Sequence, residues 1–260
     1  MHSYQAHGVR PLRGMLPIVA SLLIFSGGQS PLIGQPTSQT DSAPPEFVEI
    51  RQIIPDILVE LRYHGANNFT GAPVPGYTKE KCWMTRRAAA QLAKVQADLR
   101  PFGLGLKIFD AYRPKKAVAH FVDWVADNRP DKNKAEYFPN IEKRQLIKQG
   151  YISDKSGHSR GSSIDLTLVE ISNDEKAPPI ELDMGTPFDF FGHESWTADS
   201  NHTLEQRKNR LLLKAVMERR GFVNYSKEWW HFRLADEPFP KTYFDFSTGA
   251  EAAKGKSQDE

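Results

Sequence analysis

The residue types that could do chemistry gather in two short segments, SGHSRGSSIDL at 156–166 and EWWHF at 228–232. Together they offer three candidate metal ligands and one candidate base, namely His158, Asp165, His231 and Glu228. A catalytic zinc has three protein ligands and keeps a fourth position for water, whereas a structural zinc is closed by four ligands, usually cysteines. The chain contains one cysteine, which excludes a cysteine cluster. The pattern therefore indicates a hydrolytic His/Asp/His site holding one zinc ion.

The first segment places a histidine in a Gly- and Ser-rich loop and an aspartate in the strand that follows it. The loop can fold back over the strand so that His158 and Asp165 converge on one ion. The alternatives are a solvent-exposed histidine and an aspartate that bonds to nearby backbone. Asp165 stands between Ile164 and Leu166, and burying a carboxylate in an apolar strand is costly unless it is paired or bound to a metal. That cost favours the metal site.

The second segment raises a geometric problem, because Glu228 and His231 stand three residues apart. On a regular strand such a pair points to opposite faces, so a shared site requires a bulge or a turn at Trp229 and Trp230. Otherwise the tryptophans are core and the polar residues flank them by accident. In a shared site Glu228 would take a proton from the attacking water and pass it to the leaving amine. Arg113 could stabilise the oxyanion that forms at the scissile carbonyl, or it could make an ordinary surface salt bridge.

The hydrophobic pattern predicts that both helices and strands position these residues. Apolar residues recur at helical spacing in three segments, which follow Thr85, Pro114 and the capping box of Thr203 and Gln206. Arg113 is expected at a strand-to-helix junction, because proline suits the first turn of a helix but not the residue before it. Strands are expected at LKIFDAYR, SSIDLTLVEI and EWWHFRL, and as short pieces over 47–63. Without regular βαβ alternation, this favours a single α+β domain with a small, mostly antiparallel sheet flanked by helices, over a doubly wound sheet.

The N-terminus has the pattern of a secretory signal peptide over residues 1–28. Arg10 and Arg13 precede the apolar run MLPIVASLLIF, which is followed by small residues and is too short for a comfortable membrane span. We expect a flexible linker at 29–46, the catalytic domain at 47–248 and a disordered tail at 249–260. The expected location is the periplasm or outside the cell, or the cytoplasm if the start codon is misassigned.

Composition narrows the class of protein but not its partners. The 260 residues are 39% hydrophobic and 25% charged, which fits one soluble globular domain. A net charge of +2 gives no reason to expect a nucleic-acid partner, nor a stable membrane association after signal cleavage. Cys82 has no intramolecular partner and is expected to be buried packing. Oligomeric state is not predicted.

The two segments can now be named together, because SGHSRGSSIDL with EWWH resembles the SxHxxGxAxD and ExxH signatures of the zinc D-Ala-D-Ala dipeptidases, a VanX-like family of metallopeptidases. The motifs NFTG, DAYRP, YFPNI, MGTPFDF, DEPFP and YFDF extend the resemblance over most of the mature chain, although Ser163 stands where the signature prefers alanine. The resemblance implies that His158, Asp165 and His231 hold zinc, that Glu228 is the base and that Arg113 stabilises the transition state. It also implies that Tyr63 and Asp189 hold the substrate ammonium and that Ser156 lies near the dipeptide.

The expected reaction is hydrolysis of D-alanyl-D-alanine to two D-alanines by one zinc ion per chain. Protection against glycopeptides requires this reaction in the cytoplasm, so an exported enzyme is expected to act in cell-wall turnover or D-alanine recovery. One alternative is a zinc D,D-carboxypeptidase that trims D-alanine from peptidoglycan stem peptides and must leave the amine end open. Another is a non-catalytic peptidoglycan-binding or metal-binding module, which the joint presence of ligands, base and arginine disfavours.

Overall fold

The computed structural model describes residues 41–171 and 178–253. The predicted signal peptide lies outside the described residues, as do most of the predicted linker and residues 254–260 of the predicted tail. None of the helices in the described part of the chain is long and apolar enough to cross a membrane.

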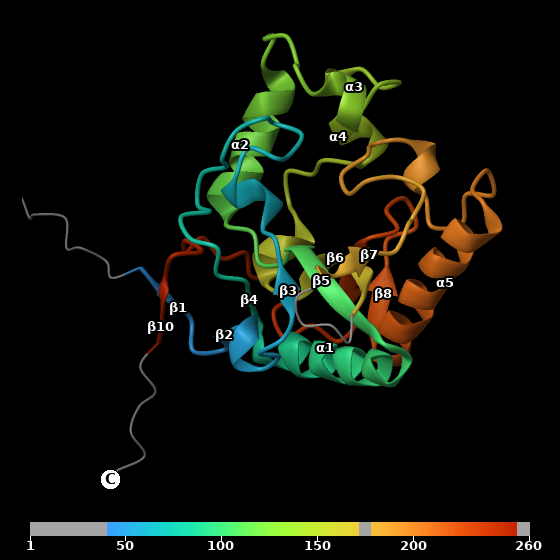
Figure 1. Ribbon diagram of the computed structural model, residues 1–260. Coiled ribbons are helices and arrows are strands. Elements are labelled where there is room, and N and C mark those ends of the chain that lie inside the picture. The colour runs from blue at the N-terminus through green and yellow to red at the C-terminus, as the bar shows by residue number, and fades with distance from the viewer. Residues whose placement is uncertain (1–40, 172–177, 254–260) are drawn as a thin grey trace, which may run out of the picture. The chain divides into compact units, whose positions relative to one another are not determined.

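A six-stranded sheet forms the centre of the fold (Figure 1). Its strands are β3 (Leu58–Val59), β5 (Leu104–Asp110), β6 (Ser163–Glu170), β7 (Ile180–Glu181), β8 (Phe222–Asn224) and β9 (His231–Leu234). They follow the order β3-β5-β6-β9-β8, and β7 pairs with the C-terminal end of β6. The β3–β5 pair is parallel and the other pairs are antiparallel. The predicted α+β class and mostly antiparallel sheet are confirmed.

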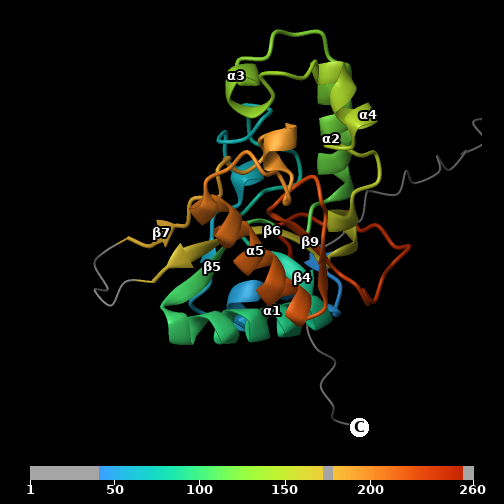
Figure 2. The ribbon, with the colours of Figure 1, turned by 90° about the vertical axis from the view of Figure 1, so that its right-hand side faces the viewer.

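Helices cover the sheet in two groups (Figure 2). The α-helices are α1 (Arg86–Leu99), α2 (Lys115–Ala126), α3 (Lys134–Tyr137), α4 (Leu146–Gln149) and α5 (Leu204–Arg219). The 3-10 helices are η1 (Ile50–Gln52), η2 (Arg62–His64), η3 (Arg100–Phe102), η4 (Lys143–Gln145), η5 (Gly157–Arg160) and η6 (His193–Ser195). Helices α1 and α5 pack against each other and against the sheet, whereas α2 and α4 pack together at the opposite end.

The helix ends follow local signals in the sequence. The Thr85 hydroxyl accepts a hydrogen bond from the Ala88 N–H at the start of α1, and the predicted capping box of Thr203 and Gln206 is present at the start of α5. Gly221, with φ of +83°, follows the end of α5. These local predictions are confirmed.

An irregularity in β5 decides which side chains face one another. The register of the β5–β6 ladder shifts between Ile108 and Asp110, and beyond the shift Asp110 lies opposite Asp165. Asp165 in turn lies opposite His231 on β9. Residues directly opposite each other in an antiparallel ladder point to the same face. The three side chains therefore form one row across β5, β6 and β9.

Two small ladders lie beside this sheet. Strand β2 (Phe47–Glu49) pairs with β4 (Trp83–Thr85), and β1 (Ser42–Ala43) pairs with β10 (Glu251–Ala252). The β1–β10 ladder corrects two predicted boundaries, since its residues belong to the predicted linker and tail. Ala43 and Ala250 are buried with Phe47 in a second hydrophobic cluster, so the packing of both ends extends the ordered domain by a few residues.

Candidate active site

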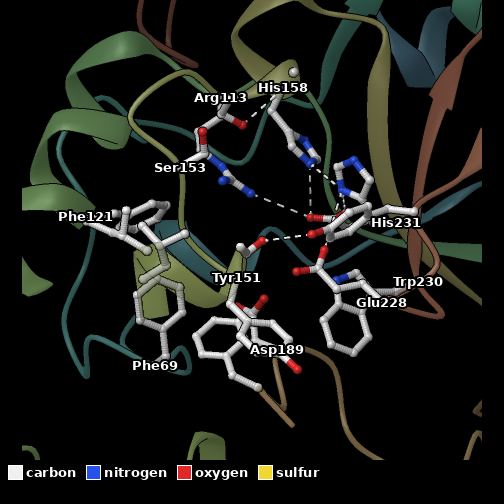
Figure 3. Close-up of a pocket in the computed structure, with 18 of the residues that line it drawn as sticks. Phe69, Arg113, Phe121, Tyr151, Ser153, His158, Asp189, Glu228, Trp230 and His231 are labelled. Atoms are coloured by element: carbon white, nitrogen blue, oxygen red, sulfur yellow. Dashed lines mark hydrogen bonds and ion pairs between the residues drawn. The ribbon is translucent and has the colours of Figure 1, made fainter. Parts of the chain in front are cut away.

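The three candidate ligands meet at one end of the row. His231 Nδ1 lies 2.9 Å from Asp165 Oδ1, and His158 Nε2 lies 3.3 Å from Asp165 Oδ2 and 3.1 Å from His231 Nδ1. The three ligand atoms all lie within 4.8 Å of one another. Figure 3 shows the two imidazoles turned toward the same point. The structure thus brings together His158, Asp165 and His231, as the sequence predicts.

Helix η5 delivers His158 to the cluster. The Ser156 hydroxyl caps η5 by accepting a hydrogen bond from the His158 N–H at 3.2 Å. Gly161 ends the helix with φ of +78°, and the Phe47 ring occupies the space that a side chain there would need. His158 Nδ1 donates to the Ala111 carbonyl at 2.7 Å. This bond assigns the tautomer, so that the Nε2 lone pair faces the cluster.

A turn, rather than a strand, solves the spacing problem of Glu228 and His231. Only the part from His231 onward belongs to β9, which corrects the predicted strand over EWWHFRL. The His231 N–H donates to the Glu228 carbonyl at 3.3 Å, and the Asn224 side-chain amide donates to the carbonyls of both residues. Glu228 Oε2 consequently lies 3.9 Å from His231 Nδ1. Trp229 and Trp230 are buried as well, so the tryptophans are core residues within a functional turn.

Arg113 lies between β5 and α2 and faces the cluster. Its guanidinium nitrogens lie 2.8 and 2.9 Å from Asp110 Oδ2 and 3.6 Å from Asp165 Oδ2. Asp110 is fully buried and accepts a further hydrogen bond from the Tyr77 hydroxyl at 2.6 Å. Two carboxylates opposite each other on neighbouring strands repel, and the Arg113 cation offsets this repulsion. The alternative of an ordinary surface salt bridge does not hold for Arg113, because its partner Asp110 is fully buried and Arg113 itself is only 13% exposed.

Asp110 is the residue of this site that the sequence analysis missed. The one signal that could have found it is its position three residues before Arg113 in DAYRP. On a regular strand that spacing says little about side-chain contact, and the register shift before Asp110 is what turns it toward Asp165.

Asp189 and Tyr63 form a second polar pair, in a cavity that they line together with the three candidate ligands. The Tyr63 hydroxyl donates to Asp189 Oδ2 at 2.8 Å, and both residues are buried. Asp189 has φ of +62°, the one positive φ among the non-glycine residues that the structure describes. Such strained backbone persists where the surroundings over-determine it, often at functional sites. Burial, and next the charge of Asp165, raise the pKa of Asp189 to about 8.

The remaining titratable groups differ in the direction of their pKa shifts. Burial raises the pKa of Glu228 well above its usual value, and the nearby carboxylates of Asp165 and Asp189 raise it further. Burial also acts to raise the pKa of Asp165, but His158 and His231 outweigh it and hold that pKa below its usual value. The surroundings therefore favour the ionised form of Asp165, whereas Glu228 and Asp189 retain their protons more tightly.

These groups line one cavity of about 460 Å³. Ser156 lies in its wall together with aromatic side chains that include Phe69, Phe121, Phe191 and Tyr151. All eight predicted site residues line this cavity, namely Tyr63, Arg113, Ser156, His158, Asp165, Asp189, Glu228 and His231. Cys82 is buried and unpaired, as expected.

The donor set fits a zinc ion. Two imidazole nitrogens and one carboxylate oxygen converge, with His158 and Asp165 buried and His231 half-buried, and zinc takes such nitrogen and oxygen ligands readily. The His158 ring is already oriented by the hydrogen bond from its Nδ1 to the Ala111 carbonyl, as is typical of histidines that bind a metal through the other ring nitrogen. Among the described residues, no second group of three or more potential ligands converges.

Several known proteins are similar to this chain over most of its length. A family model described as D-Ala-D-Ala dipeptidase matches residues 44–249. A D-alanyl-D-alanine dipeptidase of Enterococcus faecium is 40% identical over 200 residues, which cover 77% of this chain and 96% of that protein. The protein of the same name from Escherichia coli K12 is 36% identical over 189 residues, covering 73% of this chain and 84% of that protein. Among solved structures, one similar chain is a mutant of the vancomycin resistance D,D-pentapeptidase VanY in complex with zinc. The alignment covers 62% of this chain and 78% of the VanY chain. With a TM-score of 0.35 and 16% identity, that alignment supports no argument.

Proposed function

This chain belongs to the D-Ala-D-Ala dipeptidase family of metallopeptidases, and from this premise we propose that it hydrolyses D-alanyl-D-alanine to two D-alanines with one zinc ion held by His158, Asp165 and His231. The observation that carries the proposal is that one cavity contains both the ligand cluster and the buried Asp189 carboxylate. In a free dipeptide, the ammonium group and the scissile carbonyl belong to the same residue and are separated by a single Cα atom. An acid in the same cavity as the reaction centre therefore suits a short substrate with a free amine.

Each residue has a role that follows from its position. When bound, zinc polarises the scissile carbonyl and makes a water more acidic. Glu228 lies at the edge of the cluster, and its raised pKa suits a group that takes a proton from the attacking water and returns it to the leaving amine. Arg113 places a positive charge beside Asp165, where it can stabilise the oxyanion.

Asp189 and Tyr63 would hold the substrate ammonium. An arriving ammonium pairs with the Asp189 carboxylate and offsets the cost of ionising it in a buried position. A longer peptide has no charge at that point, so it would lose the ion pair and clash with the wall. The alternative function is that of a zinc D,D-carboxypeptidase. It requires this end of the cavity to accept the rest of a stem peptide.

One experiment separates the two functions. The purified protein is analysed for zinc and assayed with D-Ala-D-Ala, L-Ala-L-Ala and a pentapeptide ending in D-Ala-D-Ala, with the Glu228→Gln variant as the control for contaminating peptidases. We expect about one zinc per chain and hydrolysis of D-Ala-D-Ala alone. Trimming of the pentapeptide without hydrolysis of the dipeptide would establish the carboxypeptidase instead.

We also propose that the enzyme is exported and recovers D-alanine from wall turnover or from its surroundings. The support is the basic, apolar and small-residue pattern of residues 10–28. Cell fractionation with N-terminal sequencing tests this. Protein found solely in the cytoplasm with its N-terminus intact would contradict it.

A further inference from the structure

One aromatic ring separates the active-site cavity from a second cavity of about 370 Å³. Of the residues that line the two cavities, Phe69 alone is common to both. Its side chain is buried and packs against Phe121, Trp124 and Phe191 at ring-centroid distances of 4.9, 5.0 and 5.2 Å. The Phe69 ring is therefore the partition between the two spaces.

The loop that carries Phe69 is tightly fixed. The preceding residue, Asn68, is buried, and its Nδ2 donates to the carbonyls of Gly65 and Ala72 at 2.8 and 3.0 Å. Its Oδ1 accepts from the N–H and the hydroxyl of Thr70 at 2.9 and 2.7 Å. With both sides of its amide satisfied, Asn68 holds the loop on either side of the ring. Phe69 thus acts as a fixed wall, which gives a function to the NFTG motif.

Phe69 also lies at the end of the cavity that would receive the substrate amine. Its ring packs against Tyr63 at 5.9 Å between centroids, and Tyr63 donates to Asp189. Phe69 and Asp189 both line the active-site cavity, and Figure 3 draws both on the side of the view opposite His158. If Asp189 holds the ammonium, as proposed above, then the side chain of the N-terminal residue of the dipeptide lies next to Phe69.

The second cavity has an aromatic wall next to Phe69, formed by Trp124. The rest of its lining is mostly polar or charged and includes Asp127, Arg129 and Asn133. The Lys143 ammonium lies 4.3 Å from the Trp124 ring centroid and 2.8 Å from Asp131, so this charge already has partners. An aliphatic group that entered past Phe69 would contact Trp124 and leave the Lys143–Asp131 pair intact.

We propose that Phe69 determines specificity by closing the active-site cavity off from the second cavity, which limits the N-terminal residue of the substrate to a small side chain. This inference rests on the proposed function, because it uses the orientation that Asp189 gives the dipeptide. It assigns Phe69 a selective role and no part in bond cleavage.

The test compares kcat/KM for D-Ala-D-Ala, D-Leu-D-Ala and D-Ala-D-Leu in the wild type and in Phe69→Ala. We expect the ratio of D-Leu-D-Ala to D-Ala-D-Ala to rise at least about tenfold in the variant, since each methylene that a pocket newly admits changes discrimination by about tenfold or more. The ratio of D-Ala-D-Leu to D-Ala-D-Ala should stay unchanged. An equal rise in both ratios would indicate general loosening, and no rise in the first would show that Phe69 is not the limit; either result overturns the proposal.

Two further variants make the comparison decisive. His120→Ala enlarges the second cavity without touching the partition, so its ratios should match the wild type. Phe69→Leu is the substitute if Phe69→Ala does not fold, and it should shift the same ratio in the same direction by a smaller factor. Calorimetric binding of the three dipeptides to Glu228→Gln proteins, with and without Phe69→Ala, needs no turnover. Absence of D-Ala-D-Ala hydrolysis by the wild type would therefore refute the proposed function, while the binding ratios would still decide the role of Phe69.

Discussion

Replacing Asp189 with asparagine removes an acid from the cavity while preserving its size and an acceptor for the Tyr63 hydroxyl. Burial, and next the charge of Asp165, raise the pKa of Asp189 from its ordinary value of 3.8 to about 8 in the folded protein. A folded-state pKa above the unfolded one means that the folded protein binds this proton more tightly. The stability that the proton contributes is therefore complete below about pH 4 and is lost as the pH rises toward 8.

The size of the effect follows from the width of this window. Each pH unit within it costs the wild type about 1.4 kcal/mol, so the whole window amounts to roughly 6 kcal/mol. Asparagine does not titrate. We therefore expect the free energy of unfolding of Asp189→Asn, relative to the wild type, to increase steadily between pH 4 and 8. The variant should be the more stable protein at pH 8.

The assay is urea denaturation of both proteins in metal-free form at pH 5, 6.5 and 8. The two proteins differ only at residue 189, so the difference between their free energies of unfolding reports on that residue. Asp123→Asn, at an exposed position on α2, serves as the control and should show no such trend. A difference that does not change with pH would refute the reasoning about Asp189. In the zinc-loaded enzyme, the same variant should lose at least about tenfold in kcat/KM, because a hydrogen bond to a charged group contributes about 1.5–3 kcal/mol.

Three other substitutions give separate expectations. Glu228→Gln should retain zinc, measured by elemental analysis, but lose at least about a hundredfold in kcat; unchanged turnover would exclude Glu228 as the base. Tyr77→Phe removes the hydroxyl that donates to Asp110, which holds Arg113. With about 1 kcal/mol lost from that support, kcat should fall several-fold at constant zinc content, and a drop in zinc content instead would place the effect at the ligands. Thr203→Ala breaks the capping box of α5 and should lower the free energy of unfolding by about 1 kcal/mol, whereas a change in kcat would contradict a purely structural cap.

Local patterns in the sequence predicted much of this protein. The capping residues Thr85 and Thr203 act within their own first turn, so the starts of α1 and α5 were readable without tertiary structure. The position of Arg113 followed from the proline beside it. The burial of Asp165 followed from its apolar neighbours. The choice of His158 and His231 as candidate ligands followed from their spacing and from the resemblance to the family.

Other features depend on contacts between distant segments. Asp110 is aimed at the site by a register shift that β5 adopts only when paired with β6. The turn at the tryptophans depends on Asn224 as well as on the motif itself. Ser42 and Glu251 lie more than two hundred residues apart, so their pairing could not be read from either end alone.

The sequence by itself determined which chemical groups are present and which elements carry them, because residue type, capping and hydrophobic period act over a few residues. Only the tertiary structure decided that Asp110, Asp165 and His231 form one row, that Asp189 turns inward at φ of +62°, and that Phe69 divides two cavities. The physical reason is that strand register and side-chain packing are set by pairing across the whole chain, and a shift of a single residue would turn these side chains to the other face.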